Sequence, residues 1–107
     1  MPPSSQRRRA VFLLDSSFQF VFANHAAELL TGYTCAQLYR MTIRDTYHPE
    51  DIQWGEERMR EVSLGKVLTF ERRLRRADRS YIQVRVNWRL AEGDRYRVEM
   101  EQLEPPA

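Results

Sequence analysis

Residues 81–90 read YIQVRVNWRL, and this run carries the clearest structural signal in the chain. Its apolar side chains occupy every second position: Ile82, Val84, Val86, Trp88 and Leu90. A strict period of two is typical of a β-strand with one buried face and one solvated face. The run therefore predicts a strand in an antiparallel sheet that is covered on one side only.

Two neighbouring segments extend this sheet. Residues 67–75 precede the run across a polar turn, and residues 96–101 follow it across a second turn. In the later segment Tyr96, Val98 and Met100 alternate with charged residues, which repeats the period of two. The C-terminal part of the chain is therefore predicted to form three consecutive antiparallel strands.

The rest of the chain predicts a hairpin followed by helices. Residues 10–14 and 18–22 are apolar runs on either side of a short polar turn, as in a β-hairpin. Asn24 is placed to cap a short helix. Pro49 suits the first turn of a longer helix, which Gly65 ends. The order of two strands, several helices and three strands predicts an α+β domain.

Length and composition fit one globular domain. The chain has 107 residues, of which 42% are hydrophobic and 30% charged, and these values are ordinary for a folded domain. We expect a flexible N-terminal tail over residues 1–9, a folded domain over residues 10–104 and a C-terminal tail over residues 105–107.

Charge and cysteine content exclude several classes of protein. Seventeen Lys and Arg against fifteen Asp and Glu leave a formal charge of +2, too little to indicate nucleic-acid binding by itself. The only cysteine is Cys35, which excludes an internal disulfide and a Cys-rich zinc site. There is no apolar run long enough for a transmembrane helix or a signal peptide. We therefore expect a cytoplasmic domain without membrane insertion.

Four stretches, in this order, resemble the PAS domain family over residues 10–104. The hairpin over residues 11–24 has the Asp turn and terminal Asn of the family. Residues 26–33 read AAELLTGY, which is similar to a PAS helix that ends in Gly-Tyr, and residues 48–51 read HPED, like the start of the long PAS helix. Residues 70–78 read FERRLRRAD, which is similar to a PAS strand and turn. The family's Asp-Gly turn is Asp-Arg here, so either the turn type differs or the arginine is strained.

The resemblance implies a fold and a role. PAS domains have a five-stranded antiparallel sheet with several short helices and one longer helix packed on one face, around a small cavity. Their N-terminal and C-terminal strands pair in one curved layer. They sense ligands or cofactors, form dimers, and regulate attached or separate kinases, cyclases or transcription factors. The resemblance therefore predicts a sensory, non-enzymatic domain of a histidine-kinase or cyclic-dinucleotide signalling protein, acting by small-ligand sensing, homodimerisation or both.

The alternation of the strands and the resemblance together predict a set of interior residues. The residues expected to line a ligand pocket are Phe22, Leu38, Ile43, Tyr47, Ile52, Arg72, Leu74, Val84, Val86, Tyr96, Val98, Met100 and Gln102. The alternative is a ligand-free scaffold that serves only as a protein interaction module. Bulky inward residues would then fill the cavity: Phe20, Phe22, Phe70, Trp88, Tyr96 and Met100.

Arg72 is the unusual member of the predicted pocket, with Gln102 and Tyr47 as further polar contacts. A buried guanidinium needs a carboxylate or several carbonyls, because an unpaired buried charge costs several kcal/mol. Arg72 could bind an anionic ligand such as a carboxylate. It could also pair with an acid at the edge of the core, or extend its charged end to solvent.

No cofactor is identified by the sequence. Light-sensing PAS domains use a cysteine in an NCRFLQ helix, whereas Cys35 lies earlier, and Leu74 and Val84 stand where that subgroup has asparagines. Covalent flavin photochemistry is therefore disfavoured. Haem is also disfavoured, since His48 belongs to the HPED motif, where histidine fixes a loop. Motifs typical of metal sites and of catalysis are absent from the sequence.

The outer face of the predicted sheet mixes charges of both signs. Its arginines are Arg85, Arg89 and Arg97, and its acids are Glu71, Glu99 and Glu101. Interleaved charges favour cross-strand ion pairs over a uniformly positive field. The face has no row of aromatic residues for base stacking. We therefore expect this face to contact protein and not nucleic acid. The resemblance to PAS domains implies a dimer partner, in a homodimer, or a flanking helix as that contact.

Overall fold

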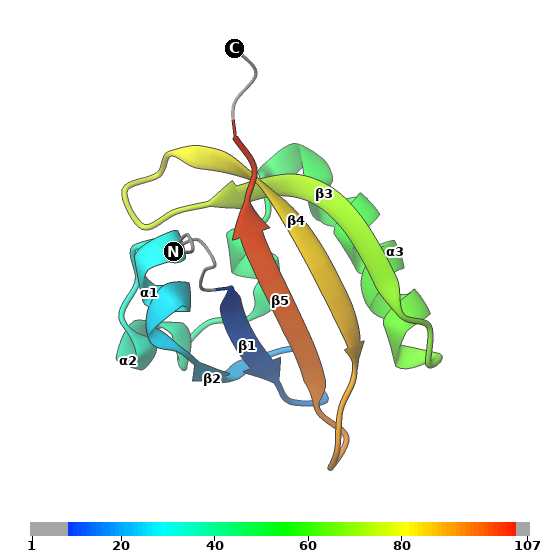
Figure 1. The fold of residues 1–107 in the computed structure, drawn as a ribbon. Helices are drawn as coiled ribbons and strands as arrows, with labels where there is room; N and C mark the ends of the chain where they lie inside the picture. The colour runs from blue at the N-terminus through cyan, green and yellow to red at the C-terminus, as the bar shows by residue number, and fades with distance from the viewer. Residues whose placement is uncertain (1–8, 105–107) are drawn as a thin grey trace, which may run out of the picture.

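The computed structural model describes residues 9–104. Of the two predicted tails, only Arg9 falls among these residues, and the rest lies outside them. The elements in chain order (Figure 1) are β1 (Ala10–Leu14), β2 (Phe20–Ala23), α1 (His25–Thr31), α2 (Cys35–Leu38), η2 (Ile43–Thr46), η3 (Pro49–Asp51), α3 (Ile52–Ser63), β3 (Leu68–Arg75), β4 (Tyr81–Leu90) and β5 (Tyr96–Gln102). The predicted α+β class is confirmed, and β4 has the bounds of the run that predicted it.

The strands form one five-stranded antiparallel sheet in the order β2-β1-β5-β4-β3. The pairing of β1 with β5 brings the N-terminal and C-terminal parts of the chain into one layer, with Ala10 opposite Met100 and Leu14 opposite Tyr96. The helices cover one face of this sheet. The uncovered face, with β5 and β1 in front, is turned towards the viewer in Figure 1. The expected joining of the two end portions is therefore confirmed.

Local sequence explains where the helices begin and end. The side chain of Asn24 accepts a hydrogen bond from the backbone N–H of Ala27 and so caps α1. Gly32 ends α1 in the left-handed conformation, with φ of 80°. Pro49 stands in the first turn of η3, where a missing N–H costs nothing, and α3 continues directly from it.

Arg79 stands where the Asp-Gly turn of PAS domains has glycine, and its backbone takes a conformation that favours glycine. Arg79 adopts φ of 73°, a left-handed conformation that is unfavourable for a residue with a Cβ. The side chain of Asp78 accepts hydrogen bonds from the backbone N–H and the hydroxyl of Ser80, which supports the turn. Of the two alternatives raised by the sequence, strain at the arginine is the one observed.

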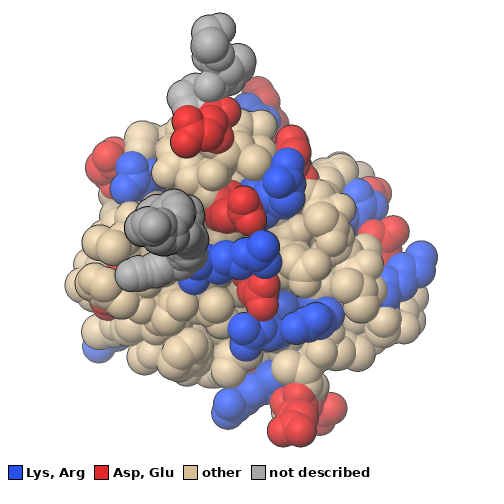
Figure 2. All heavy atoms as spheres, in the orientation of Figure 1, with Lys and Arg blue, Asp and Glu red and all other residues tan. Residues whose placement is uncertain are grey.

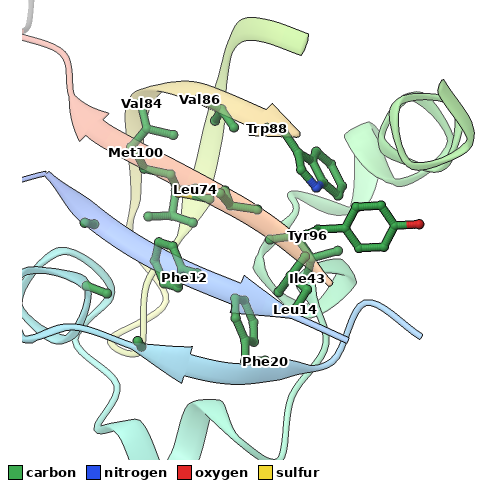
Figure 3. Packing of buried hydrophobic residues seen from close by; sticks show 14 of the residues in the cluster. Phe12, Leu14, Phe20, Ile43, Leu74, Val84, Val86, Trp88, Tyr96 and Met100 are labelled. Atoms are coloured by element: carbon green, nitrogen blue, oxygen red, sulfur yellow. The ribbon is translucent and has the colours of Figure 1, made fainter. Parts of the chain in front are cut away.

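The core lies between the sheet and the helices. Figure 3 shows side chains of β1, β2, β3, β4 and β5 converging on this space together with Ile43 of η2. The largest side chains that are almost completely buried are Trp88, Phe12 and Phe20. Met59 and Val62 supply the buried side of α3. Burial of apolar surface on this one face is what stabilises the fold.

Three residues predicted to point inward are exposed instead. Phe22 is 43% exposed, because an irregularity in the β1–β2 pairing places both Phe20 and Ala23 inside and turns Phe22 to the outer face. Ile52 is 40% exposed, since it lies one turn before the buried stripe of α3 begins at Gly55. Gln102 is exposed because it extends beyond Met100, where the β1–β5 pairing ends.

Candidate functional site

Most of the residues predicted to line a pocket do come together in the interior. The buried ones are Leu38, Ile43, Tyr47, Arg72, Leu74, Val84, Val86, Tyr96, Val98 and Met100. They come from α2, η2, the segment before η3 and the inner faces of β3, β4 and β5. Most are apolar; Arg72 is the only charged member, and Tyr47 is the member whose hydroxyl is buried without a partner among the described residues.

Arg72 is buried on the inner face of β3, with 5% of its surface exposed. Its Nη1 donates to the carbonyl oxygens of Thr46, at 3.0 Å, and Arg73, at 2.7 Å. Its Nη2 donates to the Thr46 hydroxyl at 2.8 Å. Within residues 9–104 it has no carboxylate within 4.0 Å. Neither a salt bridge nor extension to solvent describes this residue; backbone and hydroxyl oxygens receive its hydrogen bonds.

Tyr47 lies directly against this guanidinium. The Arg72 Cζ is 4.0 Å from the centre of the Tyr47 ring, which is a cation–π contact. The ring also packs on α3 at Gly55, where a Cβ would come within 2.6 Å of the ring Cζ. A glycine at that position is therefore what allows the helix to approach the ring.

The Tyr47 hydroxyl is buried and has no hydrogen-bond partner among the described residues. Burial raises the pKa of Tyr47 above its ordinary value, although the positive charges of Arg72 and Arg58 act in the opposite direction. The hydroxyl is therefore protonated at neutral pH and is an unused hydrogen-bond donor. Burial also lowers the pKa of Arg72, but a guanidinium remains charged in proteins.

The charged groups around this pair are matched with one another. Asp51 accepts hydrogen bonds from Nε and Nη2 of Arg73 at 3.0 and 2.9 Å. Glu56 is paired with Arg44 on the exposed side of α3. The hydrogen bonds from Arg73 hold the pKa of Asp51 below its ordinary value. The positive charge of Arg72 has no such partner.

Aromatic side chains border the polar pair. Trp54 of α3 meets Phe70 of β3 edge to face, with ring centres 5.0 Å apart, and both residues are half-buried. Phe70 precedes Arg72 by two residues on the same face of β3. The described site therefore consists of a cation, a phenol and an aromatic border between α3 and β3.

Two members of this site were not anticipated from the sequence. Thr46 has no local signal, because its role depends on β3 passing η2, and those residues are far apart in the chain. Gly55 does carry a signal, since a glycine within a helical pattern is unfavourable by about 1 kcal/mol and so suggests a packing reason.

The side chains of Cys35 and His48 both form hydrogen bonds with backbone groups of the fold. Cys35 is the first residue of α2, and its thiol donates to the Ala23 carbonyl at 3.1 Å. Burial raises the pKa of this thiol, so it is not activated. His48 accepts from the Glu50 N–H through Nδ1, and its ring packs at a tilt of 46° against Tyr81, with ring centres 4.8 Å apart. Across residues 9–104, no cluster of His, Cys, Asp and Glu has a geometry that could hold a metal ion.

The cross-strand ion pairs predicted for the outer face are only partly present. Arg85 pairs with Glu71 on the neighbouring strand at 3.0 Å. Arg97 is opposite Arg89 and pairs with Glu99 of its own strand at 2.8 Å, and Arg9 pairs with Glu99 at 3.1 Å. Figure 2 shows basic and acidic side chains alternating over this face. A hollow of about 180 Å³ lies among them, lined by Arg9, Thr69, Arg85, Asn87, Glu99, Met100 and Glu101.

Sheet order, one covered face and a packed interior are the features of a PAS fold, and sequence comparison agrees. Residues 8–100 match the sequence model of the PAS fold family. The chain therefore belongs to the PAS family. No curated protein sequence matches it significantly.

Solved structures share this fold at low sequence identity. A domain of a sensory box sensor histidine kinase/response regulator from Geobacter sulfurreducens superposes with a TM-score of 0.80 at 16% identity, over 87% of this chain and 82% of that one. The Cycle PAS-B domain of Drosophila melanogaster with bound ethylene glycol gives 0.79 at 22% identity, over 88% and 99%. The LOV protein of Rhodobacter sphaeroides gives 0.80 at 21%, over 92% and 61%. These likenesses establish the fold alone. Among the described residues no helix is long and apolar enough to cross a membrane.

Proposed function

We propose that this PAS domain is a cytoplasmic regulatory module that senses a small ligand in its interior, forms homodimers, and passes the signal to an attached or separate effector. The effector we favour is a histidine kinase or a cyclic-dinucleotide enzyme. The observation that carries the proposal is the buried Arg72–Tyr47 pair, which places a charge and an unpartnered hydroxyl in a mostly apolar interior. The sensor histidine kinase among the structural neighbours supports the choice of effector.

A signal requires two packings of the helices on the sheet that differ by a few kcal/mol, and a ligand that prefers one of them. In this domain η2 and α3 contact β3 through Thr46, Tyr47 and Arg72. A ligand at these residues would shift α3 relative to β3. The shift would be transmitted to the effector through β1 and β5, since the start of β1 pairs with the later part of β5, with Ala10 opposite Met100.

The outer face of β1 and β2 supports the dimer. Leu13 pairs with Phe22 across these strands, and Phe22 is 43% exposed beside the ion-paired part of the sheet. A sheet face with an apolar part and charges of both signs is suited to pairing with a second copy of itself. Replacing Phe22 with Glu should then weaken the dimer, whereas Leu29→Glu, at a position on α1 that is 65% exposed, should not.

A ligand-free scaffold remains the second candidate, and one observation favours it. Trp88, Phe12 and Phe20 are each at most 1% exposed, so large side chains occupy the interior. Such a domain would act through its outer face alone. The two candidates differ in whether the purified protein retains or accepts a small molecule.

Native and denaturing mass spectrometry of the full chain distinguish them, together with light scattering to measure the oligomeric state. The sensor predicts a mass excess that disappears on denaturation, or a metabolite that raises the melting temperature. The scaffold predicts a dimer of bare mass that no metabolite stabilises. A monomer that binds nothing would overturn both candidates.

A further inference from the structure

Arg72 has hydrogen-bonding capacity that the described residues do not use. A guanidinium presents five N–H donors, and the three hydrogen bonds of Arg72 account for both Nη1 donors and one Nη2 donor. The edge of the guanidinium formed by Nη1 and Nη2 donates to the carbonyl and hydroxyl oxygens of Thr46. The Nε–H and the second Nη2–H remain, and these form the other two-pronged edge of the planar group.

The acids near this edge are already neutralised by other arginines. Asp51 is held by Arg73, and Glu56 by Arg44. Arg58 of α3 is in turn matched with Glu61, 2.9 Å away. Arg72 is the only buried charged side chain within residues 9–104, and Asp51 attracts it only from beyond salt-bridge distance. A buried cation without a carboxylate in contact is costly, and an anion at its free edge would offset that cost.

A second unused donor stands beside the first. The Arg72 Cζ lies over the Tyr47 ring, 4.0 Å from its centre, and the buried Tyr47 hydroxyl donates to nothing among the described residues. A protonated phenol next to a buried cation offers a further donor to an oxyanion, and neither group carries a negative charge that would repel it. Phe70 and Trp54 adjoin this position with half-buried aromatic faces.

We propose that the free edge of Arg72 and the Tyr47 hydroxyl form the head-group site for an organic carboxylate with a short apolar body. The carboxylate accepts the Nε–H and Nη2–H of Arg72 together, and the Tyr47 hydroxyl donates to one of its oxygens. The apolar body enters between α3 and β3 by turning the Trp54 ring away from Phe70. This inference rests on the proposed sensory function and adds the chemical class of the ligand.

The test is a titration of the ¹⁵N-labelled full chain, followed by NMR, with sodium benzoate and with benzamide as the neutral probe of the same shape. Benzoate is expected to shift the amides of Thr46, Tyr47 and Arg72, with an affinity at least about tenfold higher than that of benzamide. Arg72→Gln should weaken benzoate binding by about tenfold or more, and Tyr47→Phe by a few-fold. Arg85→Gln, at an exposed arginine paired with Glu71, should leave it unchanged.

Each other outcome overturns the inference in a recognisable way. Equal binding of benzamide, or benzoate binding that survives Arg72→Gln, would show that charge is not recognised at this site. Shifts confined to the outer sheet face would show binding to surface arginines. If Arg72→Gln does not fold, the Tyr47→Phe comparison decides alone. If neither probe shifts the interior amides, the carboxylate inference fails, while a retained neutral ligand in mass spectrometry would leave the sensory proposal standing.

Discussion

Arg72 and Arg85 lie on neighbouring strands, but on opposite faces of the sheet. Arg85 is about half exposed and pairs with Glu71 across β3 and β4. Arg72 is 5% exposed, and its hydrogen bonds go to backbone and hydroxyl oxygens. In water an ion pair adds little, because solvent stabilises both charges well. In the interior the same side chain must be held by dipoles, and its charge remains available to a ligand.

The largest contrast is expected between an apolar side chain on the inner face of the sheet and an exposed one at the end of α3. Leu74 is completely buried on the inner face. Leu74→Ala should lower the unfolding free energy of the protein by about 3 kcal/mol, because a cavity remains. Leu64→Ala, at a position that is 76% exposed, should change it by less than about 0.5 kcal/mol. Urea denaturation measures both. Similar losses for the two variants would contradict the packing described.

Replacing each arginine by Met sharpens the comparison directly. Arg72→Met should lower the unfolding free energy by about 2 kcal/mol, because Thr46 and Arg73 lose donors in the interior. Arg85→Met should cost less than about 0.5 kcal/mol. Thermal and urea unfolding provide the measurement. A more stable Arg72→Met protein would mean that removing the buried charge outweighs the lost hydrogen bonds.

Gly55→Ala tests how tightly α3 approaches the interior pair. Alanine favours a helix over glycine by about 1 kcal/mol, but its Cβ would lie 2.6 Å from Cζ of Tyr47. Because the ring is buried, we expect a net destabilisation of about 1 kcal/mol. In a Tyr47→Leu background the same change should become neutral or favourable. Stabilisation in the unmodified protein would show that the ring moves freely.

The smallest effect is expected from the outer-face acids. Arg97 and Arg9 hold the pKa of Glu99 below its ordinary value of 4.5. A pKa lowered by folding contributes stability above the unfolded pKa, and this is lost as the pH falls through the folded pKa. Glu99→Gln should therefore lose less stability than the unmodified protein between about pH 7 and about pH 3. Glu92→Gln, in the exposed β4–β5 turn, is the control and should follow the unmodified protein.

Regular elements were predictable because their signals are local. The alternation in residues 81–90 depends only on which side chains prefer water, and β4 has the same bounds. The cap at Asn24 likewise needs only the next few residues. Phe22 was misplaced because an irregularity in pairing breaks the period of two, and nothing in an apolar run indicates where that break occurs.

The alternating pattern alone placed Arg72 on the inner face of its strand, since side-chain direction in a strand follows from position. The residues that surround Arg72 could be identified only from the tertiary structure. Thr46 and Tyr47 reach it from a segment far away in sequence, and the acids that might have paired with it bind other arginines. Counter-charges depend on distances of a few ångströms between such segments, and no local preference of the chain encodes those distances.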